Sequence, residues 1–106
     1  MTFDMAENKN FRHGHRERVR ARFLREGLSR FADYEVLELM LFYAIPRRDT
    51  KEQAHALDDL FGSLYGTLTA SEEALCRVAG IGARTAKFLR SVYSFMRYVA
   101  DRKSVV

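Results

Sequence analysis

Apolar residues recur along the chain at intervals of three and four, which is the spacing of one face of an α-helix. The first such segment runs from about His15 to Glu26 and is followed by Gly27, a natural helix stop. Its apolar face consists of Val19, Phe23 and Leu24. The strict alternation typical of a β-strand is absent from the sequence. The pattern therefore predicts an all-α fold, a compact bundle of five or six helices.

A second helix should begin at Asp33 as its cap and reach about Ala44. It is apolar on nearly every side, at Val36, Leu37, Leu39, Met40, Leu41 and Phe42. Such a helix is expected at the buried centre of the fold. Pro46 prevents its continuation, and Thr50 followed by Gln53 has the spacing of a capping box at the start of a third helix.

The third helix should stop at Gly62, and Ser63 and Ser71 are candidate caps of two short helices. The inward residues expected on the third helix are Ala54, Leu57, Leu60 and Phe61. Glu72 and Glu73 would lie in the first turn of the helix that Ser71 caps, where the helix dipole favours them. The last helix is expected from about Ala83 to Arg102, with Ala86, Leu89, Val92, Tyr93 and Met96 inward.

The length of 106 residues corresponds to about one domain, and 47% hydrophobic with 30% charged residues is typical of a globular chain. We expect a basic, flexible arm over residues 1–13, the helical domain over 14–102 and a tail over 103–106. The longest apolar run, "VLELMLFYAI", is too short to span a bilayer, and the N-terminus lacks the features of a signal peptide. A cytoplasmic protein without a membrane partner is predicted. The lone Cys76 excludes an internal disulfide and is expected in the core.

The charge is segregated along the chain. Residues 11–30 carry +5 and residues 77–106 carry +6, whereas residues 31–76 carry −6. Two basic segments that meet in space would make one positive face, the footprint of a polyanion partner. We therefore expect a single face that includes Arg16, Arg20, Arg84 and Lys87. The alternative is an arginine-rich surface that is only solvated.

The stretch "VAGIGARTAKFLR" places Gly80, Ile81 and Gly82 between two helices, and we call these residues the glycine turn. Gly80 ends one helix at a position that commonly needs a positive φ, and Gly82 begins the next. Ile81 should fill the gap between the helices. The free backbone amides near Gly82, Ala83 and Arg84 are suited to hold one phosphate, with further contact from Arg84 and Lys87. If the phosphate belongs to a nucleic acid, these contacts read no base, and the affinity should not depend on the nucleotide sequence.

The loop "IPRRDT" also lies between two helices, as the glycine turn does. If the glycine turn binds a phosphate of one strand of a DNA duplex, Arg47 and Arg48 would form a weaker contact with the other strand. Alternatively, these arginines pair with Asp49 or Glu52 and only connect the helices. The sequence leaves both interpretations open.

The glycine turn and its surroundings resemble the helix-hairpin-helix motif of DNA repair proteins at Val78, Gly80, Ile81, Gly82 and Ala86. Residues 14 to about 100, including "LFYAIPRRD", resemble the N-terminal region of the RadC-like DNA repair family, also designated UPF0758. The resemblance implies a DNA-binding domain, acting on duplex or branched DNA through phosphates, without the C-terminal JAB/MPN metalloprotease-like domain of full-length members. That domain or another protein is a further candidate partner. Similar motifs often bind a monovalent cation through turn carbonyls.

No catalytic or metal site is expected. His13 and His15 lack the proline and serine of the metalloprotease motif and, with His55, are the only histidines. The helical arrangement also resembles base-excision DNA glycosylases, but Arg84 stands where their lyase members have a nucleophilic lysine, and a guanidinium remains protonated. Two interpretations remain: a non-catalytic DNA-binding domain, or a protein-interaction module with the same fold.

Overall fold

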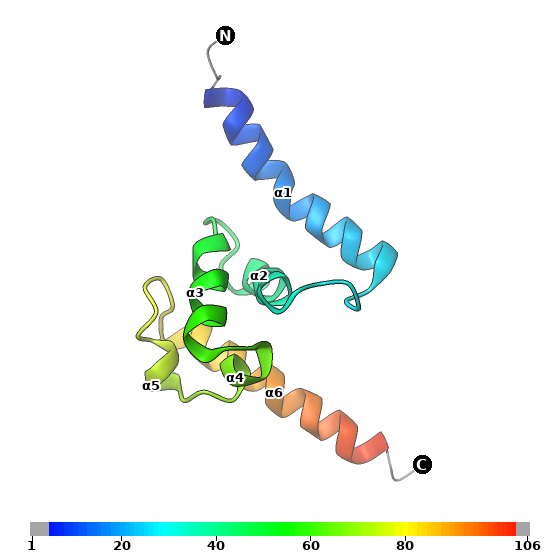
Figure 1. Cartoon of the computed structure of the whole chain (residues 1–106), viewed down its shortest axis with the longest axis vertical. Coiled ribbons are helices and arrows are strands. Elements are labelled where there is room, and N and C mark those ends of the chain that lie inside the picture. The colour runs from blue at the N-terminus through cyan, green and yellow to red at the C-terminus, as the bar shows by residue number, and fades with distance from the viewer. Residues whose placement is uncertain (1–4, 104–106) are drawn as a thin grey trace.

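A computed structural model describes the backbone of residues 5–103 and the side chains of residues 14–103. Over these residues the chain forms helices and no strand (Figure 1). They are α1 Met5–Glu26, α2 Asp33–Ala44, α3 Lys51–Phe61, α4 Leu64–Leu68, α5 Glu72–Leu75 and α6 Ala83–Lys103. The predicted all-α fold is confirmed, and no helix in this part of the chain is long and apolar enough to cross a membrane.

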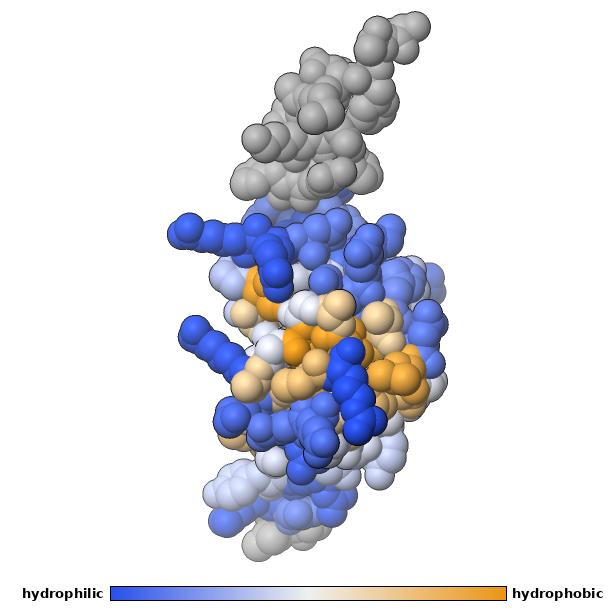
Figure 2. Space-filling view, turned by 90° about the vertical axis from the view of Figure 1, so that its left-hand side faces the viewer, coloured by the Kyte–Doolittle hydropathy of each residue, from blue (hydrophilic) through white to orange (hydrophobic). Residues whose placement is uncertain are grey.

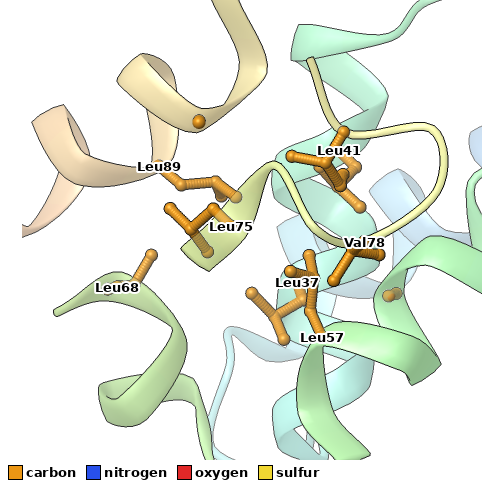
Figure 3. Packing of buried hydrophobic residues seen from close by; sticks show 10 residues of the cluster. Leu37, Leu41, Leu57, Leu68, Leu75, Val78 and Leu89 are labelled. Carbon is orange, nitrogen blue, oxygen red and sulfur yellow. The ribbon is translucent and has the colours of Figure 1, made fainter. Parts of the chain in front are cut away.

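The core forms around α2, which α3, α4 and α6 pack against. Figure 3 shows Leu37 and Leu41 of α2 meeting leucines from the other helices. The fully or almost fully buried leucines of this cluster are Leu37, Leu41, Leu57, Leu68, Leu75 and Leu89. Burying each such side chain contributes roughly 1.5–3 kcal/mol. The expectation that the second helix is the buried one is confirmed, although Met40 is only half-buried.

The helix ends follow the sequence signals where the signal is a glycine or a serine. Gly27 and Gly62 follow α1 and α3 with φ of 72° and 83°, which only glycine adopts without strain. Ser63 accepts a hydrogen bond from Gly66 N at 2.9 Å and Ser71 from Ala74 N at 3.1 Å. These stops and caps are confirmed.

Two other predicted caps are wrong. Residue 32 rather than Asp33 is the N-cap of α2, and the Asp33 carboxylate instead accepts a hydrogen bond from Leu64 N at 2.7 Å, at the start of α4. Thr50 precedes α3 but makes no side-chain cap, because its side chain is buried, and Asp49 accepts from Lys51 N at 3.1 Å instead. Asp33 thus bonds a residue distant in the sequence, whereas the Thr50 hydroxyl is buried and makes no hydrogen bond to a described residue.

The first helix is longer than its apolar pattern predicts. It begins at Met5, ten residues before the expected start at His15. No proline interrupts this stretch, and Gly14 costs a helix only about 1 kcal/mol relative to alanine. The last helix ends at Lys103, one residue beyond the expected Arg102. Residues 1–4 and 104–106, and the side chains of residues 1–13 including His13, lie outside the described part.

Several residues expected inside are exposed. Leu24 is 82% exposed, Leu60 58% and Met96 53%. Leu60 lies about 100° around the helix from Phe61, away from the face of Ala54 and Leu57. Cys76, expected in the core, is also exposed, because the short helix α5 turns Leu75 inward in its place. The predictions for these four residues are wrong.

Candidate nucleic-acid interface

The glycine turn joins the end of the α5 segment to α6. Gly80 has φ of 91°, as predicted, and a Cβ added to it would lie 2.5 Å from Nε2 of Gln53 in α3. Ile81 is 4% exposed and joins the hydrophobic core, which confirms that it fills the gap between the helices. Two independent features therefore require glycine at position 80: the positive φ and the close packing against the first turn of α3.

Gly82 differs from Gly80. Its φ is not positive, its carbonyl accepts a hydrogen bond from Ala86 N at 2.9 Å, and a Cβ added to it would meet no atom within 4 Å. Nothing in the described fold therefore demands glycine at this position. The open space lies at the N-terminus of α6, where the first N–H groups of a helix lack intrahelical partners. Ala83 and Arg84, which follow, are exposed.

The two basic residues that follow the turn differ in their engagement. Arg84 makes no hydrogen bond or ion pair to any described residue and projects into solvent. Lys87, one turn further along α6, forms an ion pair with Glu72 of α5 at 3.1 Å. Both members of this pair are exposed, so the pair contributes at most about 1 kcal/mol. Arg84 is thus the more available cation.

The loop between α2 and α3 meets the glycine turn. Arg48 donates a hydrogen bond to the carbonyl oxygen of Gly80 at 3.3 Å. Arg47 is exposed and has no hydrogen-bond or ion-pair partner within the described residues. Neither arginine pairs with Asp49 or Glu52 there, so the interpretation of this loop as an ion-paired connection finds no support.

The α1 arginines in the sequence-based site are held by protein groups. Arg16 donates hydrogen bonds to the carbonyl oxygens of Phe42 at 3.0 Å and Ile45 at 2.7 Å, and to that of Arg48. Its guanidinium is half-buried, and burial lowers the pKa of Arg16. Arg20 pairs with Glu17 at 3.1 Å and lies over the Phe42 ring. Whether these two arginines share one face with Arg84 and Lys87 stays a prediction.

Sequence reasoning missed three residues that support this region. Gln53 packs against Gly80, and Arg90 of α6 donates to the carbonyl oxygens of Thr69 at 3.2 Å and Ala70 at 3.1 Å. Glu38 is buried in α2, with Oε1 3.3 Å from Nε2 of His15. Glu38 is a charged residue inside the longest apolar run, and Gln53 stands three residues after Thr50, but neither position indicated the contact that the residue makes.

Figure 2 shows the side of the molecule on which α5 and the glycine turn lie. Long hydrophilic side chains project around a patch of apolar residues on this side. Among the side chains that can be described, no three His, Cys, Asp or Glu residues gather where they could hold a metal ion. His15 contacts Glu38, and His55 stacks on the ring of Tyr34 at 4.1 Å between centroids.

Two curated proteins resemble the chain closely over part of its length. One, named UPF0758 protein FN0909, from Fusobacterium nucleatum subsp. nucleatum, is 44% identical over 86 residues, which is 81% of this chain and 36% of that protein. The other, UPF0758 protein SPO0054 from Ruegeria pomeroyi, is 48% identical over 68 residues, 64% of this chain and 30% of that protein. The chain is homologous to UPF0758 proteins.

This homology supports the resemblance to UPF0758 proteins identified in the sequence. The chain spans about a third of the length of these curated relatives. No family model matches the chain, and no solved structure shows a significant match.

Proposed function

We propose that the chain is a non-catalytic, sequence-independent DNA-binding domain of a RadC-like protein, built on a helix-hairpin-helix motif that holds a backbone phosphate at the glycine turn. The observation that carries the proposal is the open space at Gly82 beside the unpaired Arg84. The fold has no steric need for glycine there, whereas an anion approaching the amides of α6 does need the space.

The chemistry of the region suits a phosphate. The N-terminus of α6 presents free N–H groups and the positive end of the helix dipole. Arg84 would contact the same phosphate or its neighbour, and Lys87 would exchange its exposed partner Glu72 for a phosphate. Arg47 and Arg48, in the loop that touches the turn, would contact a further phosphate. None of these groups reads a base edge, so affinity should depend on salt and little on sequence.

The monovalent cation suggested by resemblance does not fit this turn well. The carbonyl oxygen of Gly80 accepts a hydrogen bond from the guanidinium of Arg48. A cation bound to that carbonyl would lie beside the positively charged Arg48 guanidinium and be repelled by it, or would have to displace it. We therefore assign no cation to the site.

The test is a charge reversal at the turn compared with one at the far end of the same helix. Arg84→Glu with Lys87→Glu should abolish binding of a short duplex at moderate salt, because two carboxylates would face the phosphate. Arg97→Glu with Arg102→Glu changes the net charge equally, about 20 Å along α6, and should retain most of the affinity. Equal losses in the two variants would mean that only overall charge matters. Retained binding in the first variant would reject the turn as the site.

One observation favours the alternative, a protein-interaction module. The C-terminal half of α6 exposes Phe95 by 68%, Met96 by 53%, Tyr98 by 59% and Val99 by 65%. Arg97, Arg102 and Lys103 border these side chains, so a fitting partner would present apolar groups flanked by carboxylates. Phe95→Ser with Val99→Ser should leave duplex affinity unchanged if DNA is the ligand at the turn. A wild-type domain that binds no duplex at low salt would make this α6 surface the leading candidate.

A further inference from the structure

We infer that Arg16 is a positioning residue, which holds the glycine turn in place through Arg48 instead of contacting phosphate itself. The inference rests on the proposed function of the turn and adds the role of α1 in it. Arg16 lies in the basic segment of the sequence, and charge alone would place it at a DNA interface. Its hydrogen bonds to backbone carbonyl oxygens instead indicate that it stabilises the segment behind that interface.

The first link runs from α1 to the end of α2. The last carbonyl groups of a helix lack intrahelical partners, and the planar guanidinium can donate to several acceptors at once. Arg16 bonds the carbonyl oxygens of Phe42 at 3.0 Å and Ile45 at 2.7 Å, and its Cζ lies 4.7 Å from the centre of the Phe42 ring. The same nitrogen that bonds Ile45 also bonds the carbonyl oxygen of Arg48. Arg16 thereby fixes the path of the chain as it leaves α2.

The second link runs from that loop to the glycine turn. Arg48, whose backbone Arg16 holds, donates from its side chain to the carbonyl oxygen of Gly80 at 3.3 Å. The α3 helix that follows the loop meets the turn again, because the Gln53 side chain packs against Gly80. The turn is therefore held by the α2–α3 segment at two points, and that segment is held by Arg16.

The consequence is that α1 affects the turn without touching it. Removing the Arg16 guanidinium would free the loop, lengthen or break the contact between Arg48 and Gly80, and leave the N–H groups of α6 less well ordered for an anion. Because Arg16 makes no phosphate contact in this arrangement, its loss should weaken DNA binding without changing the number of cations released.

The experiment compares Arg16→Gln with Arg25→Gln in the full chain. Arg25 lies on the same helix, is exposed, and interacts only with Glu26 at 3.8 Å among the described residues, so the two variants lose the same charge. In the free protein, Arg16→Gln should shift the amide resonances of Gly80 and Gly82, and Arg25→Gln should not. With duplex DNA, Arg16→Gln should bind about five-fold more weakly, the effect of one typical hydrogen bond, at an unchanged salt slope.

The outcomes separate this inference from the proposed function. Turn amides that do not move in Arg16→Gln overturn the inference whatever the DNA result. A salt slope that falls by about 0.9 would also overturn it, because Arg16 would then be a phosphate contact. If Arg16→Gln shifts the turn amides but the wild-type domain binds no DNA, the positioning role is supported and the proposed function is rejected.

A second variant covers the case in which Arg16→Gln does not fold. Arg48→Gln removes the second link alone and should shift the same turn amides while the amides of α1 keep their wild-type positions. If the turn amides stay in place in this variant, Arg48 does not transmit anything to the turn, and the inference is wrong.

Discussion

The two glycines of the glycine turn should respond in opposite ways to substitution. Gly80 has φ of 91° and a Cβ there would lie 2.5 Å from the Gln53 side chain, whereas Gly82 has open space around it and stands at the N-cap position of α6. Gly80→Ala therefore tests the fold and Gly82→Asp tests the function. Aspartate is among the best N-cap residues, so it satisfies the helix while placing a carboxylate where the phosphate would bind.

The sizes of the two effects follow from the geometry. A side chain forced into left-handed backbone costs roughly 1–2 kcal/mol, and displacing the flexible end of Gln53 adds to it. For a domain of this size each kcal/mol lowers the Tm by about 4–8 °C, so Gly80→Ala should lose roughly 5–20 °C. Gly82→Asp should stay within about 4 °C of the wild type or exceed it, because an exposed N-cap change alters stability by about 0.5 kcal/mol.

Thermal unfolding followed by circular dichroism and duplex titration at two salt concentrations measure both quantities. Gly82→Asp should lose duplex binding at moderate salt with its Tm intact, and Arg25→Gln, which changes the net charge by the same amount, should keep most of it. Duplex affinity equal to that of the wild type in Gly82→Asp would refute the phosphate site. An unchanged Tm in Gly80→Ala would refute the argument from backbone conformation.

Three further results are expected. Replacing Arg47 and Arg48 together with alanine should lower the salt slope of duplex binding by up to about 1.8, and an unchanged slope would show that the loop does not contact phosphate. A hydrogen bond from the Ala32 backbone holds the pKa of Glu35 below its ordinary value. This stabilisation is full above the unfolded-state pKa of about 4.3 and is lost as the pH falls through the lower folded-state value. The difference in unfolding free energy between wild type and Glu35→Gln, about 1 kcal/mol at pH 7, should therefore shrink as the pH falls below the folded-state pKa of Glu35. Cys76 is exposed, so a thiol reagent should modify it in the native protein without prior unfolding; protection until unfolding would contradict this exposure.

The sequence predicted the features that depend on neighbouring residues. The buried α2 follows from an apolar run that only Glu38 interrupts. The positive φ of Gly80 and the helix stop at Gly62 follow from glycine at the end of a helical segment. Ser63 and Ser71 cap the short helices because a cap bonds an N–H only three residues away. Such contacts depend only on residues within about one helical turn of each other in the sequence.

The sequence failed where the packing of distant segments decides the environment of a side chain. Asp33 has the right residue type for a cap, yet its acceptor capacity goes to Leu64 N, 31 residues later. Thr50 is buried by packing that no local pattern contains. Met96 continues the apolar face of α6, but the helix extends past the elements that would cover it, and Met96 stays exposed. The arrangement of the helices in space decides each of these.

The number of basic residues in the sequence also overstates how many can contact phosphate, and this number determines the salt dependence of binding. The two basic segments hold fourteen Lys and Arg residues. Arg16, Arg22 and Arg90, however, donate to backbone carbonyl oxygens, and the structure gives each a role in holding segments together. If only Arg47, Arg48, Arg84 and Lys87 contact phosphates, the slope of log K against log salt should be about −3.6. A slope steeper than about −6 would mean that the arginines of α1 bind DNA as well, and Arg16 would have to exchange its carbonyl partners for phosphate.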